Sequence, residues 1–386
     1  MSALAARIVA SVAAIDPVAW DACLPGEAES HAYYNTCEAA AASSGVGLRM
    51  AAIVVESGAE IVAVAPVFRL NYRLDTPLQG SLRGLGDALF RHVPGLVTLK
   101  ALCVGSPYAE RCHLGFSAGL DAEGRAAAFQ LLASTLQRQA TLEGAHLVVW
   151  KDLAPELERQ AGAFLSPMGF ARLASLPVAV LDLPFRDDAG YLASLSAATR
   201  KDIRRKLAKA GDVRVEFRTD IAGLEQEIDA LYESTRAHSG LDYGELELLP
   251  PGYFASVSRA LGERAIFALY WIGEELAAFN LLLIEADRVI DKFLGMRYPL
   301  AREHNLYAVS WMTNVRFCIG RGIRLFQSGQ TAYASKLRFG SRLVPSAIHV
   351  RHRSAPLQWA LRSLSPWLGF DRFDPDLAER AGKKAA

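Results

Sequence analysis

Residues 265–295 read AIFALYWIGEELAAFNLLLIEADRVIDKFLG, and this stretch decides the fold. It holds three apolar runs, Ala265–Ile272, Leu276–Glu285 and Val289–Gly295, separated by the pairs Gly273-Glu274 and Ala286-Asp287. Apolar runs joined by such short polar turns are typical of antiparallel strands. The stretch therefore predicts a three-stranded antiparallel meander.

Helical patterns surround this meander. Upstream we expect a helix over Tyr191–Ala210, a strand over Val213–Arg218 and a helix over Gly223–His238. Downstream, a helix from about Asn305 to Ile319 precedes a short strand, Leu325–Gln327. The order predicts a mixed sheet flanked by helices.

The first half of the chain has a comparable order. A hairpin over residues 48–71 precedes a long helix after Gly124, a strand at His146–Trp150 and a helix starting at Pro155. We therefore expect an α/β (α+β) protein with two domains of the same kind, residues 1–184 and 185–350. An amphipathic helix and tail, residues 351–386, would follow.

Composition limits the class of protein. The 386 residues are 51% hydrophobic and 22% charged, which is typical of folded domains and excludes long disorder. We find neither an apolar stretch of membrane-spanning length nor a secretion signal, so the expected location is cytoplasmic. The five cysteines show no CxxC pair and are expected to be reduced thiols.

Charge is uneven along the chain. The net charge is only +1, yet residues 292–353 carry eleven Lys and Arg against Glu303 as the single acid. This basic C-terminal third suits an anionic partner such as a phosphate-bearing donor or an anionic membrane surface. DNA is not expected as a partner.

Several motifs of the second half resemble one family. They are GEELAAFNLLL, FLGMRYP, EHNLYAVSWMTNVRFCIGRGIRLFQSG and SGQTAYASKLRFG, with YLASLSAATRKDIRRKLAKA upstream. In this order they resemble the acyltransferase domain of the FemAB-like and BioF2-like branch of the GNAT superfamily. The resemblance implies two tandem GNAT-like units, each with a mixed sheet whose middle strands splay apart to admit an acyl donor.

The same resemblance implies the chemistry. GNAT enzymes generally pass an acyl group from a thioester such as acyl-CoA to an amine, and the Fem branch takes an aminoacyl group from aminoacyl-tRNA. The chain lacks the Arg/Gln-x-x-Gly-x-Gly/Ala loop that holds the CoA pyrophosphate, which argues against ordinary acetyl-CoA use. The donor is therefore expected to be CoA, an acyl carrier protein or tRNA, and no covalently bound cofactor is expected.

The predicted helix 191–210 carries a cluster of cations. Helical spacing places some of these cations on one side, where they can converge on a donor phosphate. The alternative is a solvated helix face. The candidate donor-binding residues are Arg200, Lys201, Arg204 and Arg205.

Polar residues follow the strand at Leu325–Gln327. Ligands commonly bind beyond strand ends, so Lys336 and Tyr333 can hold a carboxylate or steady an oxyanion, while Ser328 or Gln330 orients the acceptor. The alternative is a tight turn with a structural lysine.

Two further places carry candidate residues. Asp291 interrupts an apolar strand, where it is either a general base for the attacking amine or a structural ion-pair partner. His238 and Tyr243 follow a helix and either contact substrate or belong to an ordinary helix end.

Two other chemistries are disfavoured. Gly115-Phe116-Ser117-Ala118-Gly119 matches the nucleophile-elbow pattern, but no helix starts directly after it. His349 and His352 have no carboxylate or thiol placed to complete a metal site, so no metal is expected.

Residues 356–370 place leucines on one helical stripe beside Trp359 and Trp367, with arginines nearby. Such a segment either lies in the interface of an anionic membrane or packs on its own domain.

We therefore expect an N-acyltransferase that joins an acyl or aminoacyl group to an amine by direct attack, because no Ser or Cys is convincingly paired with a base. Asp291, Lys336 and Tyr333 are the candidate catalytic residues. One alternative is a catalytically degenerate GNAT pair that binds an anionic lipid or nucleic-acid surface. A further alternative is a Fem-type, aminoacyl-tRNA-dependent transferase acting on a cell-wall precursor. The enzyme would be either cytoplasmic or bound peripherally to the inner face of the membrane.

Overall fold

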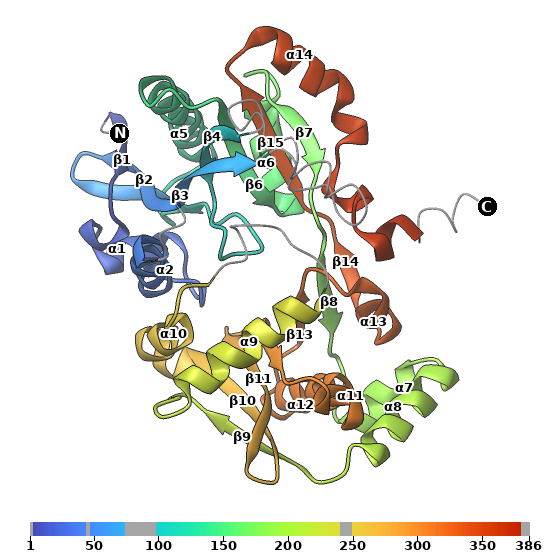
Figure 1. Cartoon of the computed structure of the whole chain (residues 1–386). Helices are drawn as coiled ribbons and strands as arrows, with labels where there is room; N and C mark the ends of the chain where they lie inside the picture. The colour runs from blue at the N-terminus through green and yellow to red at the C-terminus, as the bar shows by residue number, and fades with distance from the viewer. Residues whose placement is uncertain (1–2, 44–46, 74–97, 240–248, 380–386) are drawn as a thin grey trace. The chain divides into compact units, whose positions relative to one another are not determined.

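The computed structural model describes residues 3–43, 47–73, 98–239 and 249–379. The chain divides into two compact units, coloured along the sequence in Figure 1. The first contains the described parts of Met1–Pro177, Asp242–Pro250 and Val344–Ala386, and the second those of Val178–Leu241 and Pro251–Leu343.

These limits differ from the expected domains at 1–184 and 185–350. Strand β8 (Val178–Asp182) pairs antiparallel with β13 (Leu325–Gly329), so the second unit begins at residue 178. Strand β15 (Ala347–His352) pairs with strands of the first sheet, so the chain returns to the first unit near its end. The first unit is therefore discontinuous, which a linear division of the sequence misses because distant strands choose their partners in space.

The sheet of the first unit has the order β1-β2-β3-β4-β6-β15-β7, with β5 beside β3. Its other strands are β1 (Leu4–Val9), β2 (Arg49–Ser57), β3 (Glu60–Arg73), β4 (Thr98–Val104), β5 (Gly115–Phe116), β6 (Leu147–Leu153) and β7 (Ala171–Ala174). The predicted hairpin is confirmed as β2 and β3. Neighbours are antiparallel except β4 and β6, which run parallel.

Helices flank this sheet. They are α1 (Pro17–Cys23), α2 (His31–Ser43), α5 (Ala122–Leu142), α6 (Pro155–Leu165) and α14 (Ala355–Leu364), with short 3-10 turns η1 (Val12–Ala14), η5 (Ser365–Trp367) and η6 (Phe370–Arg372). Asp121 caps α5 by accepting the Gly124 N–H at 2.7 Å. The core forms where Phe129 of α5 stacks on Trp150 of β6, with ring centroids 4.9 Å apart.

The sheet of the second unit has the order β14-β8-β13-β12-β11-β10-β9. Its remaining strands are β9 (Val213–Arg218), β10 (Ala265–Ile272), β11 (Glu275–Ile284), β12 (Arg288–Met296) and β14 (Arg342–Val344). The predicted meander is confirmed, because β10, β11 and β12 pair antiparallel in sequence. Strands β12 and β13 run parallel. Two mixed sheets flanked by helices thus form the α/β architecture expected from the sequence.

The helices of the second unit include two departures from expectation. They are α7 (Asp188–Ser194), α8 (Ala197–Lys209), α9 (Glu225–Ser239), α10 (Tyr253–Leu261), η4 (Gly262–Arg264), α11 (Leu300–Glu303), α12 (Leu306–Gly320) and α13 (Tyr333–Arg338). The single helix expected over 191–210 is wrong, because Leu195 is extended and Ser196 starts α8 by accepting the Thr199 N–H. The segment expected as a loop after β13 contains α13.

Tyr191 ties three of these helices together. Its hydroxyl donates to the carbonyl oxygen of Phe339 at 2.8 Å and accepts the indole N–H of Trp311 at 2.8 Å. All three side chains are buried. Because Phe339 directly follows α13, this contact fixes the end of α13 against α7 and α12.

Candidate functional site

Strands β12 and β13 separate in the middle of the second sheet. Their parallel pairing runs from Arg288 beside Leu325 to Ile290 beside Gln327 and ends there. Beyond that point β12 stays paired with β11, and β13 continues beside β8. The next residue on each strand, Asp291 and Ser328, therefore lies where the two strands part.

Both strands carry an irregularity at this place. In β12, Asp291 and Phe293 face neighbouring residues of β11, so Lys292 is the extra residue of a bulge. In β13, Gln327 and Gly329 face neighbouring residues of β8, so Ser328 is extra. Bulges redirect side chains and are common beside active sites. The two bulges lie directly at the point where β12 and β13 separate and redirect the side chains there.

Two buried amides hold the carboxylate of Asp291. The side-chain N–H of Asn280 on β11 donates to Oδ1 at 2.8 Å, and that of Asn314 on α12 donates to Oδ2 at 3.3 Å. Asn280 and Asn314 are fully buried, whereas Asp291 is half-buried. N–H donors stabilise a negative charge. The arrangement presents an oriented carboxylate at the opening between the strands.

Groups near Asp291 respond to its charge. Burial, reinforced by the Asp291 carboxylate, raises the pKa of the Cys318 thiol to about 12, and the same two causes raise the pKa of Tyr270. Cys318 is therefore a thiol at neutral pH and a poor nucleophile. All five cysteines are buried and free in the structure.

The predicted residues after β13 are brought together by a tight turn. Thr331 and Ala332 both adopt left-handed backbone angles, with φ of 63° and 47°. Such conformations cost roughly 1–2 kcal/mol per non-glycine residue and are often found at functional sites. The turn leads directly into α13, which carries Tyr333 and Lys336.

Tyr333 and Lys336 are both buried. The Lys336 ammonium donates to the carbonyl oxygen of Gln330 at 2.8 Å, and the Ser328 hydroxyl donates to that of Ala179 at 3.4 Å. A buried ammonium needs such polar partners. Four predicted residues thus lie on one strand end, turn and helix.

The predicted cations lie on α8 in different surroundings. Arg200 donates to the carbonyl oxygens of Leu192, Ala193 and Leu195, so it closes the end of α7. Arg205 pairs with Asp202 at 2.6 Å. Lys201 and Arg204 are exposed. The break at Ser196 thus gives Arg200 a local partner that a continuous helix would not supply.

His238 lies on the last turn of α9. Its ring stacks on Tyr298, with centroids 3.8 Å apart, and its Nε2 lies 2.8 Å from the Arg302 guanidinium. The structure therefore joins His238 to a second aromatic and a cation. Tyr243 lies outside the described residues.

Asn280 and Asn314 were not singled out from the sequence. Asn280 interrupts the apolar run LAAFNLLLI, as Asp291 interrupts its own strand, so the same criterion was able to find it. Asn314 lies in a helix with several polar residues, and nothing in the sequence links it to Asp291. Only the packing of α12 on the sheet brings it there.

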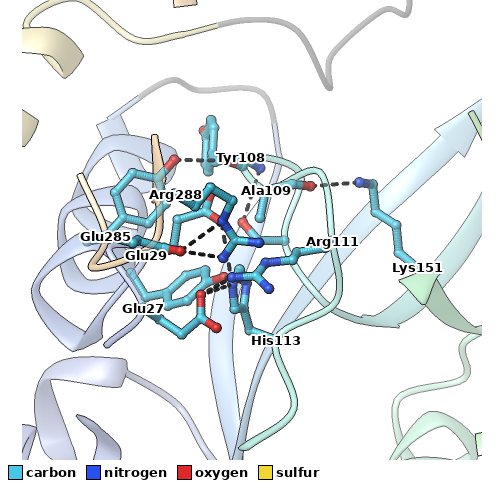
Figure 2. Close-up of polar contacts among 12 residues, drawn as sticks. Glu27, Glu29, Tyr108, Ala109, Arg111, His113, Lys151, Glu285 and Arg288 are labelled. Atoms are coloured by element: carbon cyan, nitrogen blue, oxygen red, sulfur yellow. Dashed lines mark hydrogen bonds and ion pairs between the residues drawn. The ribbon is translucent and has the colours of Figure 1, made fainter. Parts of the chain in front are cut away.

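The corresponding strand end of the first unit is filled by its own side chains. There the parallel pairing of β4 and β6 ends with Val104 beside Trp150. The next residue, Lys151, donates to the Ala109 carbonyl at 3.1 Å (Figure 2). It also pairs with buried Asp152. Asp152 has a φ of 56° and also accepts from Ser175.

Figure 2 also shows a partly buried network in the same unit, in which Arg111 pairs with Glu27 beside His113. Tyr34 completes this network, since its hydroxyl lies 2.6 Å from His113 Nδ1. These contacts join residues of the first unit that are distant in the sequence. The Asp291 site, by contrast, lies where β12 and β13 part in the second unit.

Other chemistries find little support in the described residues. After β5, five residues separate Phe116 from the start of α5 at Ala122, so Ser117 does not occupy a nucleophile elbow. No group of three or more His, Cys, Asp or Glu in the described ranges could hold a metal ion. None of the helices described here is long and apolar enough to cross a membrane.

The comparisons with known proteins agree with this geometry. Residues 197–337 match the family described as "Acetyltransferase (GNAT) domain". This segment contains β12, β13, Asp291 and most of α13. A search of curated sequences finds no matching relative.

Solved structures share the fold across most of the chain. The crystal structure of FemX is 13% identical with a TM-score of 0.55, covering 84% of this chain and 93% of its own. The C-terminal domain of a protein assigned as a lysylphosphatidylglycerol synthetase, from Agrobacterium fabrum, is 14% identical with a TM-score of 0.53, covering 88% and 91%. A tandem GNAT protein from the clavulanic acid biosynthesis pathway is 12% identical with a TM-score of 0.50, covering 90% and 99%. Residues 197–337 therefore match an acetyltransferase (GNAT) domain, and the two-unit fold around them is shared with FemX and the tandem GNAT protein.

Proposed function

We propose that the second unit is an N-acyltransferase, which moves an acyl or aminoacyl group from an activated donor to an amine by direct attack. The observation that carries the proposal is the separation of β12 and β13 with the Asp291 carboxylate at the separation point. An opening between two strands accepts an extended donor, and a carboxylate there meets the incoming amine. The GNAT match over residues 197–337 supports this assignment.

In the proposed reaction the amine nitrogen attacks the carbonyl carbon of the donor. A C–N bond forms, the bond to the leaving thiol or ribose oxygen breaks, and the amine proton passes to the Asp291 carboxylate. Asn280 and Asn314 act as positioning residues, because they orient both carboxylate oxygens. Asp291 is then neutral, and it regains its negative charge when this proton passes to the leaving group or to solvent.

The residues around α13 are assigned to the carbonyl and the acceptor. Lys336, with Tyr333 beside it, would stabilise the tetrahedral oxyanion, which is negative only in the transition state. Ser328 and Gln330 would orient the amine acceptor. The strained turn at Thr331 and Ala332 supports this assignment, because strain is retained where the surrounding structure requires a particular geometry.

The donor is proposed to carry phosphate groups, as CoA, the phosphopantetheine of an acyl carrier protein, or tRNA. Exposed Lys201 and Arg204 support this part of the proposal, because they are accessible to a phosphate. Arg200 and Arg205 of the same helix would add to the positive electrostatic potential there. An aminoacyl donor is kept as an alternative to acyl-CoA, because one structural neighbour is named as a lysylphosphatidylglycerol synthetase. His238 and Tyr243 are assigned to acceptor contacts.

A panel of acyl-CoA, acyl carrier protein and aminoacyl-tRNA donors with several amines, analysed by mass spectrometry of the amide product, tests the activity. Asp291→Asn should lower kcat by about 10²–10⁴-fold with the donor KM unchanged. Asp287→Asn, on the exposed turn before β12, is the matched control and should leave kcat unchanged. Asn280→Ala should lower kcat more than it changes KM, as expected of a positioning residue.

The outcomes separate the alternatives. Activity that disappears on ribonuclease treatment would favour the Fem-type reaction on a cell-wall precursor. No transfer with any donor, together with salt-sensitive binding to RNA or anionic lipid, would favour a degenerate GNAT pair. Full activity of Asp291→Asn would show that Asp291 is not the base. The expected cytoplasmic location, peripheral to a membrane, is a part of the proposal that the exposed side chains of α14 support.

A further inference from the structure

The C-terminal end of the first unit exposes many large apolar side chains. Nine such residues are exposed in the described chain, and six of them lie between residues 357 and 373. The six are Leu357, Trp359, Leu364, Trp367, Leu368 and Phe373. Trp359 is 73% exposed and Trp367 61%, while Trp20, Trp150 and Trp311 are buried. Exposed apolar residues gathered in this way usually mark a binding surface.

Helix α14 packs on β7 and β15 of its own unit, yet none of its residues is buried (Figure 1). Gln358 holds it in place: its Nε2 donates to the Gly169 carbonyl at 2.7 Å, and its Oε1 accepts the His352 N–H at 2.6 Å. The helical period places Leu357, Ala360 and Leu364 on the side away from Gln358. The helix is thus oriented by a polar contact, and its apolar side chains point outward.

A basic pocket of about 620 Å³ lies beside this helix. Its lining includes Arg351, Arg353, Arg362 and Trp359, and none of its lining residues is acidic. Within the described part of the chain, the side chains of Arg351 and Arg362 make no ion pair or hydrogen bond, and the Arg353 side chain donates only to the Gly144 carbonyl. Uncompensated guanidinium groups around one hollow attract a phosphate.

We propose that this face docks onto an anionic phospholipid membrane. The phosphate of a lipid headgroup occupies the arginine pocket, while Trp359 and Trp367 enter the interface together with the neighbouring leucines. Tryptophan is favoured at the boundary between headgroups and acyl chains, and arginines near an anionic surface add electrostatic attraction. Trp359 lines the arginine pocket and further exposed apolar side chains follow it in the chain. A lipid surface can contact both the arginines and the apolar groups, whereas a soluble phosphate contacts the arginines alone.

Vesicle binding by the full chain tests this proposal. Phosphatidylcholine vesicles with added phosphatidylglycerol should float the protein, and pure phosphatidylcholine vesicles should not. On binding, tryptophan fluorescence should shift to the blue and be quenched by brominated lipid. The shift and the quenching should disappear in the double variant Trp359→Phe, Trp367→Phe, because the added signal comes from these two side chains.

Matched variants distinguish vesicle binding through the pocket from binding through overall positive charge or any exposed apolar side chain. Arg351→Gln and Arg362→Gln should each weaken binding to the anionic vesicles about fivefold, as expected for one cation near an anionic surface. Trp359→Ala should also weaken binding to the anionic vesicles, because it removes a side chain that enters the interface. Exposed Arg324→Gln and Leu142→Ala, where Leu142 is 81% exposed, should bind like the parent chain.

Equal binding to neutral and anionic vesicles, or binding that the pocket variants leave unchanged, would overturn the proposal. So would tight binding of glycerol phosphate with no vesicle binding, which would indicate a soluble anion. Self-association of the parent chain that Trp359→Ala abolishes, without vesicle binding, would show that a second copy covers the face. Transfer to a soluble amine should survive in all these variants, so failure here is distinguishable from failure of the proposed activity.

Discussion

Replacing Tyr191 by Phe removes one hydroxyl that serves two buried partners. The Phe339 carbonyl loses its donor, and the Trp311 indole N–H loses its acceptor, both at 2.8 Å in the structure. Each buried polar group left unpaired costs about 1–3 kcal/mol, so the free energy of unfolding of the second unit should fall by about 2–6 kcal/mol. That is a large share of the roughly 5–15 kcal/mol that a domain has available.

Urea unfolding followed by hydrogen exchange on peptides of α7, α12 and α13 measures this loss. Peptides of β3, in the other unit, serve as an internal reference because the two units need not unfold together. Tyr298→Phe is the matched control, since the Tyr298 hydroxyl makes no hydrogen bond within the described part of the chain. A Tyr191→Phe value within about 0.5 kcal/mol of that control would refute the reasoning.

Three further predictions follow from buried groups. Burial lowers the pKa of His349, His352 and His146, so the unfolded chain takes up protons first, and stability should fall as pH drops through about 6.5. His349→Leu should flatten that dependence in urea titrations at several pH values, and an unchanged slope would assign the effect to other groups. Gly295→Ala places a Cβ against the Phe279 ring and 2.9 Å from the backbone of Leu231, so it should cost about 1–3 kcal/mol in the same assay. Phe129→Ala removes the stacking partner of Trp150 and should destabilise the first unit by about 3–5 kcal/mol, measured on β6 peptides, while peptides of β11 keep their protection.

Local patterns predicted most of the elements. The meander of β10, β11 and β12, the hairpin of β2 and β3, and the helices α5, α6, α9 and α12 all follow from apolar periodicity and turn residues, which act over a few positions. The errors arose where local pattern and capping conflict. The run 191–210 looks continuous by composition, yet Ser196 starts a new helix because its hydroxyl satisfies an N–H of the first turn.

In the candidate site, too, some residues could be predicted from the sequence and others could not. Asp291 was detectable because a carboxylate in an apolar strand requires a reason, and Lys336 because it follows a strand end. The partners of Asp291 were not predicted from the sequence, since Asn280 comes from the adjacent strand and Asn314 from a helix packed on the sheet. Hydrogen bonds between residues 11 and 23 positions apart depend on register and packing.

By itself, the sequence determined the class of fold, its two similar halves, the resemblance to the FemAB-like branch and the basic, amphipathic C-terminal segment. Only the tertiary structure decided that β15 returns to the first sheet, that β12 and β13 part directly before Asp291 and Ser328, and that three arginines face one pocket. The physical reason is the distance along the chain over which each interaction acts. Periodicity, capping and turn chemistry act between residues close in the chain, whereas strand partners, bulges and pockets depend on which distant surfaces bury each other.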